Sequence, residues 1–304
     1  MNLSGVISQL ISLFLMMLAG YIVARAGIVT PEFRQRLSAF TLNTAAPCII
    51  VSAVLQSEST PGDMIRATGV SFIFFLLMIA LAALLVRLVR TPKPQHGLDQ
   101  LMLIFTNVGF MGIPVIQSLY GPEGVALLSM FILMFNLFFF SYGILLISGG
   151  LKLNLRALCN ACIFAALLGL FFGVTGLRLP APIESTLAAI GGMNTPLAMM
   201  IIGASLAHSD VHAALTNPRL YRVCALRMIV MPLLVFGIMR LMPIHPMLIG
   251  ISTVLAAMPV AGNCSMASDL YTPEDMTASH AVILSTLMSG ATLPLICAMI
   301  IALL

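Results

Sequence analysis

The feature that most constrains this chain is a series of ten apolar runs of about 18–25 residues, separated by short polar loops. An α-helix of about 20 apolar residues crosses the hydrocarbon core of a bilayer. Only 8% of the residues are charged, whereas soluble domains carry about 25%. We therefore predict an all-α polytopic membrane protein without a soluble domain. The predicted spans cover about 4–24, 36–56, 65–89, 98–120, 123–147, 157–175, 184–207, 219–241, 247–269 and 276–303.

Lys and Arg are unevenly distributed among the loops, which predicts the orientation of the chain. Cytoplasmic loops of membrane proteins carry an excess of these residues, so we place the loops after odd-numbered spans in the cytoplasm. Both termini then lie on the other side of a cell membrane, the inner membrane in a bacterium. The basic residues after odd-numbered spans are Arg25, Arg34, Arg36, Arg87, Arg90, Lys93, Lys152, Arg156, Arg219 and Arg222; those after even-numbered spans are Arg66, Arg178 and Arg240.

The two halves of the chain, residues 1–150 and 151–304, share short motifs at an offset of 151 residues. Leu119–Gly124 reads LYGPEG and Leu270–Asp275 reads LYTPED, while Asn43-Thr44 matches Asn194-Thr195. With five spans in each half, the halves must insert in opposite orientations. This inverted repeat is typical of secondary transporters, and we expect one membrane unit divided in space into a scaffold and a transport part.

Two spans are interrupted near their middle by residues that helices tolerate poorly. Span four contains Thr106–Pro114 and span nine contains Met258–Asn263. Proline lacks an N–H group, and glycine adds backbone freedom. In hydrocarbon, backbone groups freed in this way must be buried in protein or face a wet cavity. Because the interruptions lie at corresponding places in the halves, we predict that broken helices four and nine cross and form the substrate site.

The residues around these interruptions are the candidate substrate site. The N-terminal ends of half-helices carry free N–H groups and a partial positive charge, which can hold a carboxylate. We identified no Lys or Arg near the centre of a span, so neutral amides and backbone donors are expected to bind the anion. The amides have an alternative role as helix caps, and the glycines as packing residues. The predicted substrate-binding residues are Asn107, Gly109, Gly112, Pro114, Pro259, Gly262, Asn263 and Ser265.

Polar residues within other spans are candidates for a supporting role along the pathway. Polar residues inside spans tend to face the bundle interior or a cavity, and hydrogen bonding between helices is the alternative role. Gln117 and His280 are weaker candidates, the latter as a proton carrier or a helix-boundary residue. The predicted supporting residues are Asn43, Thr44, Pro47, Asn136, Asn194 and Thr195.

Several of these segments together resemble the auxin efflux carrier family, in its bacterial malonate/malate-type permease branch. They are Asn107–Pro114 (NVGFMGIP), Ala257–Ala261 (AMPVA), Leu284–Ser289 (LSTLMS), Thr292–Leu295 (TLPL) and Pro47, and the likeness covers nearly the whole chain. The resemblance implies ten helices in two inverted repeats, related to sodium/proton antiporters and bile-acid symporters, with crossing helices four and nine in the transport domain. It also implies carboxylate substrates and a homodimer. The long cytoplasmic loop of many plant members is absent.

We weighed three classes of function. The first is a secondary carrier of small organic anions, mono- or dicarboxylates such as malonate or malate or an auxin-like weak acid, working by alternating access in an elevator-like movement. The second is a channel or receptor of the same fold. The third and weakest is an intramembrane enzyme, which would need a nucleophile–base pair or metal ligands at membrane depth.

Cofactors and partners follow from the carrier interpretation. We expect no cofactor and no resident metal, and a coupling ion, Na⁺ or H⁺, is left open. The Cys159 and Cys162 pair and the His208 and His212 pair are interpreted as packing and loop residues rather than metal ligands. The expected partners are the small organic anion, the lipid bilayer and a second copy of the chain. No nucleic-acid partner is expected, because the net charge of +4 is a topology signal.

Overall fold

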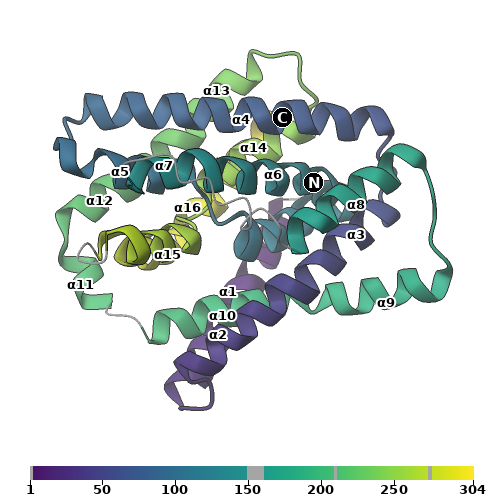
Figure 1. Cartoon of the computed structure of the whole chain (residues 1–304), viewed down its shortest axis with the longest axis horizontal. Coiled ribbons are helices and arrows are strands. Elements are labelled where there is room, and N and C mark those ends of the chain that lie inside the picture. Colours follow the sequence, from purple (N-terminus) through teal and green to yellow (C-terminus); the bar gives the residue numbers. More distant parts are fainter. Residues whose placement is uncertain (1–2, 149–160, 209–210, 273–275) are drawn as a thin grey trace. The chain divides into compact units, whose positions relative to one another are not determined.

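The computed structural model describes residues 3–148, 161–208, 211–272 and 276–304 (Figure 1). The regular structure in these ranges is helical, apart from an isolated antiparallel bridge between Thr106 and Val260. Six helical stretches are long and apolar enough to cross a membrane: Pro31–Gln56, Pro61–Leu88, Val108–Ser148, Ala181–Ala207, Pro218–Arg240 and Thr277–Leu303. Shorter apolar helices cover Leu10–Arg25, Ala161–Thr175 and Pro246–Ala257. The chain is therefore a multi-pass, all-α membrane protein, and the number of ten spans stays a prediction.

The helices fall into two compact units, each of which draws on both halves of the chain. The first unit comprises Met1–Gly69, Gly109–Leu133 and Cys159–Ser209, and the second comprises Val70–Val108, Met134–Leu158 and Asp210–Leu304. The helices α4 (Pro61–Leu88) and α6 (Ile113–Phe138) contribute residues to both. The expected boundary between the sequence repeats, at residue 150, lies outside the described residues, as does part of the Leu270–Asp275 motif.

Close approach of helix backbones at glycines holds the first unit together. Its other helices are α1 (Leu3–Arg25), α2 (Pro31–Phe40), α3 (Ala46–Gln56), α8 (Ala161–Thr175), α9 (Ala181–Gly192) and α10 (Asn194–Ala207). A Cβ added to Gly203 of α10 would lie 1.8 Å from the Met17 carbonyl oxygen of α1, and one added to Gly20 would lie 2.2 Å from the Met200 oxygen. Small residues permit such close contacts. In lipid, the van der Waals packing between helices at these contacts contributes to their association.

The second unit has an aromatic core next to the first interruption. Its helices are α5 (His96–Ile104), α7 (Ile144–Ser148), α11 (Val211–Thr216), α12 (Pro218–Ala225), α13 (Met231–Arg240), α14 (Pro246–Ala257), α15 (Gly262–Tyr271) and α16 (Thr277–Leu303), and a short 3₁₀ turn covers Lys93–Gln95. The buried Phe105 ring lies 5.6 Å from that of Phe135 and 5.0 Å from that of Phe139, both edge-on. This geometry suits the quadrupoles of aromatic rings and fixes the chain where α5 ends.

Three π-helical segments each end two residues before a proline. Proline cannot donate to the carbonyl four residues earlier and its ring clashes there, and the wider π turn accommodates this loss. Pro114 was expected to break span four, but it lies in the first turn of α6, which continues from such a segment. The interruption itself lies earlier, at 105–107. The segments are Thr41–Ala45 before Pro47, Val108–Gly112 before Pro114 and Leu226–Val230 before Pro232.

The expected turn between spans four and five is a sharp break within α6. Gly121 has φ 63° and ψ −156°, a backbone conformation that favours glycine because it has no Cβ. Pro122 follows directly, and its fixed φ suits the first turn of the helical stretch that continues to Phe138. A further π-helical segment, Phe139–Gly143, then joins this stretch to α7.

Candidate functional site

The two interruptions pair with each other through their backbones in the second unit. The helix α5 ends at Ile104, and the chain is extended at Phe105 before the bridge residue Thr106. The Asn107 N–H donates to the Pro259 carbonyl at 2.9 Å, and the Ala261 N–H donates to the Phe105 carbonyl at 3.1 Å. We call residues 105–107 and 258–261 the paired interruption. Its backbone groups satisfy each other, which an apolar environment demands.

The helix α16 supports the paired interruption with a side chain. The Val260 N–H donates to the Ser285 hydroxyl oxygen at 3.1 Å, and the Ser285 hydroxyl donates in turn to the Ala281 carbonyl at 2.6 Å. Ser285 and Val260 are fully buried. A buried N–H group that lost its acceptor would cost about 1–3 kcal/mol, so this contact helps to fix the extended backbone of 258–261.

A buried arginine lies against both interrupted helices. Arg227, in the π-helical segment Leu226–Val230, is 0% exposed. Its Nη1 donates to the Leu103 carbonyl at 2.8 Å and its Nη2 to the Leu255 carbonyl at 3.4 Å. The expectation that no Lys or Arg lies deep within a span was wrong. The available signal was an arginine within the apolar run 219–241, away from the basic cluster at its start.

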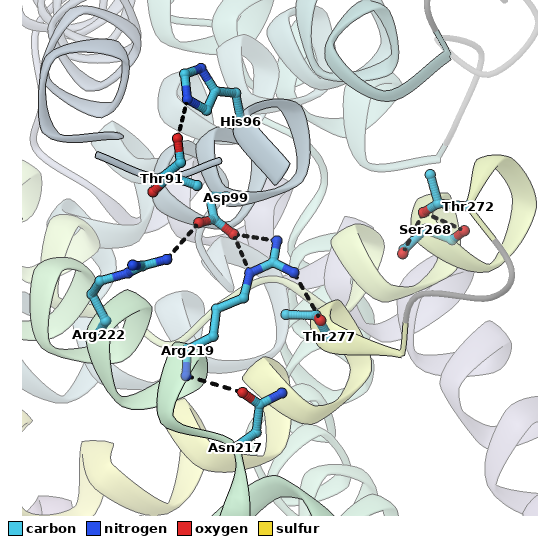
Figure 2. Close-up of polar contacts among 9 residues, drawn as sticks. All are labelled: Thr91, His96, Asp99, Asn217, Arg219, Arg222, Ser268, Thr272 and Thr277. Carbon is cyan, nitrogen blue, oxygen red and sulfur yellow. Dashed lines mark hydrogen bonds and ion pairs between the residues drawn. The ribbon is translucent and has the colours of Figure 1, made fainter. Parts of the chain in front are cut away.

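An ion cluster, also unforeseen, joins the beginnings of three helices in the second unit (Figure 2). The Asp99 side chain of α5 is 2% exposed, and its Oδ1 accepts from Arg219 Nη2 at 2.6 Å and from Arg219 Nε at 3.0 Å. Arg222 Nη2 lies 3.7 Å from Asp99 Oδ2, and Arg219 Nη1 donates to the Thr277 hydroxyl at 3.3 Å. The cluster shows that α5, α12 and α16 begin on the same side of this unit.

Five predicted substrate-binding residues lie at or just after the paired interruption. Pro259 is buried within it, and Asn107 is half-buried. The helix α15 begins at Gly262, which is exposed, so the N–H groups of Gly262 and the half-buried Asn263 are in its first turn. The Ser265 and Ser279 hydroxyls are 2.6 Å apart, which links α15 to α16. A helix N-terminus with an amide side chain beside it is suited to an anion.

The remaining predicted substrate-binding residues belong to the first unit. Gly109 and the buried Gly112 lie in the π-helical segment Val108–Gly112, and Pro114 is buried at the start of α6. The role of all eight residues in binding substrate stays a prediction.

The supporting residues divide in the same way. Asn136 is buried in the second unit, whereas the others are in the first. Asn43 is exposed, and its amide donates to the Ala39 carbonyl at 2.8 Å, one turn earlier in the same helical stretch. Asn194 is 1% exposed, and its Nδ2 has no partner among the described residues. Thr44, in the π-helical segment Thr41–Ala45, and Pro47, at the start of α3, are half-buried.

A small cavity in the first unit brings together a different polar set. The Thr195 hydroxyl donates to Gln117 Oε1 at 3.3 Å, and Gln56 Nε2 donates to the Ser52 hydroxyl oxygen at 2.6 Å. Gln117, Gln56 and Ser52 line a cavity of about 130 Å³ next to Gly191 of α9. Of these polar residues the sequence pointed only to Gln117 and Thr195.

In the parts of the chain that the structure describes, no group of three or more His, Cys, Asp or Glu residues is arranged to hold a metal ion. Cys159 lies outside the described residues, whereas Cys162 packs against Leu42 with its Sγ 3.4 Å from the carbonyl oxygen. His208 Nδ1 lies 2.9 Å from the Ala204 carbonyl oxygen of the preceding turn.

An all-α, multi-pass protein with two interrupted helices that pair through their backbones has the architecture of a membrane transporter. Comparison with known proteins supports this class. The family described as "Membrane transport protein" matches residues 5–152 and 150–297, so the chain belongs to this family, the auxin efflux carriers. An "Uncharacterized transporter" of Methanothermobacter thermautotrophicus is 27% identical over 307 residues, which cover 96% of this chain and 97% of that protein.

Proposed function

We propose that this protein is a secondary carrier of small organic anions, with mono- or dicarboxylates such as malonate or malate as substrates. The observation that carries the proposal is the paired interruption, after which α15 begins. The first turn of α15 contains the exposed Gly262 and the half-buried Asn263 amide. Free N–H groups at a helix N-terminus stabilise a carboxylate by about 0.3–1 kcal/mol each, and by more when partly buried.

The division into two units supports alternating access as the mechanism. The paired interruption, the aromatic core and the ion cluster all belong to the second unit, which is therefore held together by its own contacts. The first unit is held by its glycine contacts between α1 and α10. An elevator-like movement of one unit against the other would expose the substrate site to each side in turn, and a homodimer would anchor the static unit.

The membrane potential sets the direction expected of a carrier without a coupling ion. At −100 mV inside, one elementary charge gains about 2.3 kcal/mol, which favours the efflux of an anion. Uptake against this potential would need a coupling ion.

Transport by the purified protein in liposomes tests the proposal. A panel of labelled mono- and dicarboxylates would be offered while voltage, pH and sodium are each clamped in turn. Asn263→Ala and Asn107→Ala should lower transport at least about tenfold, the effect of losing about 1.4 kcal/mol of substrate binding. Asn217→Ala is the matched control, because Asn217 is also an asparagine at a helix N-terminus, where its side chain accepts from the Arg219 N–H of α12.

Unchanged transport kinetics in both Asn107→Ala and Asn263→Ala would place the substrate elsewhere. Saturable uptake with an unchanged KM in Asn217→Ala would support the assignment. Unitary current steps in a planar bilayer would instead show a channel and refute the carrier.

A further inference from the structure

Arg227 is a buried charge without a carboxylate partner. It is fully buried, and it forms no ion pair within the described residues. Among the described residues of the helices packed against Arg227, the acidic side chain is Asp99 of α5. Arg219 and Arg222 pair with this carboxylate. The other titratable groups on those elements, apart from arginines, are His96 of α5, Tyr221 and Cys224 of α12, and His280 and Cys297 of α16, and Cys264 of α15 also faces Arg227. An unpaired charge in such a place is costly unless fixed dipoles compensate it.

The two carbonyls that bind Arg227 are those that the interruptions leave without their helical donors. In a continuous helix, the Leu103 carbonyl would accept from the N–H of Asn107, four residues later. That N–H donates to Pro259 instead. The Leu255 carbonyl would accept from residue 259, which is a proline and has no N–H group; it accepts from the Met258 N–H at 3.2 Å and from Arg227 instead. One guanidinium therefore fills the same position in both interrupted helices.

The charge of the guanidinium matches the dipoles that it meets. Leu103 and Leu255 lie in the last turns of α5 and α14, and each helix C-terminus carries a partial charge of about −0.5. Two such ends together compensate about one positive charge. In carriers with interrupted helices, these C-terminal ends and the unwound carbonyls are where Na⁺ is coordinated.

We propose that Arg227 is a positioning residue that acts as a built-in cation for the C-terminal ends of α5 and α14, in the place that a dissolved cation would otherwise occupy. The paired interruption then keeps its shape without sodium. A consequence, which rests on the proposed function, is that anion transport does not use a sodium ion bound at this position.

Thermal unfolding of the full chain in detergent tests the cation role without any transport measurement. The wild-type melting temperature should be the same in sodium chloride and in choline chloride at equal ionic strength. Arg227→Ala should lower it by about 5 °C or more, because two buried carbonyls lose a charged donor. Guanidinium at low millimolar concentration should restore about half of this loss in a saturable way, whereas urea, its neutral analogue, should restore none.

Arg240→Ala is the matched control, since Arg240 is exposed at the end of α13 and guanidinium should not stabilise that variant. If Arg227→Ala does not fold, Arg227→Lys and Arg227→Gln test the same role. The variant with the charged lysine should melt at a higher temperature than the variant with the neutral glutamine. Three results would overturn the proposal: equal effects of guanidinium and urea on Arg227→Ala, a Gln variant as stable as the Lys variant, or saturable stabilisation of the wild type by sodium. A chain that passes these tests but transports no carboxylate would refute the proposed function alone.

Discussion

Replacing Asp99 by asparagine removes the charge of the ion cluster while nearly preserving the shape of the side chain. In the structure, Asp99 Oδ1 accepts from two nitrogens of Arg219, at 2.6 and 3.0 Å, and the carboxylate is 2% exposed. Removing one partner of a fully buried ion pair costs about 3–5 kcal/mol. The Arg219 side chain is 15% exposed and Arg222 is 36% exposed, so water compensates part of the loss. We expect a cost of about 2–3 kcal/mol.

This cost is measurable as a melting temperature. For chains of 150–250 residues 1 kcal/mol shifts the midpoint by about 2–4 °C, and we expect Asp99→Asn to melt about 4–12 °C below the wild type. A double-mutant cycle of Asp99→Asn with Arg219→Ala should show a coupling energy of about 2 kcal/mol. Arg222→Ala is the matched control and should cost less than about 1 kcal/mol, because its 3.7 Å contact is more exposed.

The cluster also predicts how stability responds to salt. Since the carboxylate is buried, raising the ionic strength should change the difference between wild type and Asp99→Asn by little. A variant that melts within about 1 °C of the wild type, or a coupling energy near zero, would show that the contact does not hold α5, α12 and α16 together.

Two further substitutions probe the packing of each unit. Ser285→Ala should cost about 1–3 kcal/mol, because the buried Val260 N–H loses its acceptor, whereas Thr292→Ala removes only a bond within α16 and should cost less; thermal unfolding compares them. In the first unit, Gly203→Ala would place a Cβ 1.8 Å from a backbone oxygen, where real contacts below 3.0 Å essentially do not occur, so α1 and α10 must separate by about 1.2 Å. We expect a cost of about 3 kcal/mol or more, and Gly237→Ala, which meets no atom within 4 Å, is the control that should melt close to the wild type.

Most of the helical architecture can be predicted from the sequence because the bilayer leaves the backbone few alternatives. Apolar runs must satisfy their hydrogen bonds internally, so they form helices, and clusters of Gly and Pro mark where those helices fail. The interruption of span four was predicted over Thr106–Pro114, and the structure confines it to residues 105–107, with helix from Val108 onward. Gly and Pro weaken the helical hydrogen bonds over several residues, so they do not fix the position of the break. The π-helical turn before Pro114 allows the chain from Val108 onward to remain helical.

For the candidate site, the sequence identified the amides and interruptions by itself, because intramembrane polar and helix-breaking residues stand out in an apolar chain. Only the tertiary structure decided which segments of the chain contact one another. Arg227 reaches Leu103 across 124 residues, and Arg219 reaches Asp99 across 120. No local pattern encodes contacts between segments so far apart. Whether an arginine within an apolar run faces a loop or two helix ends depends on which helices the fold brings around it.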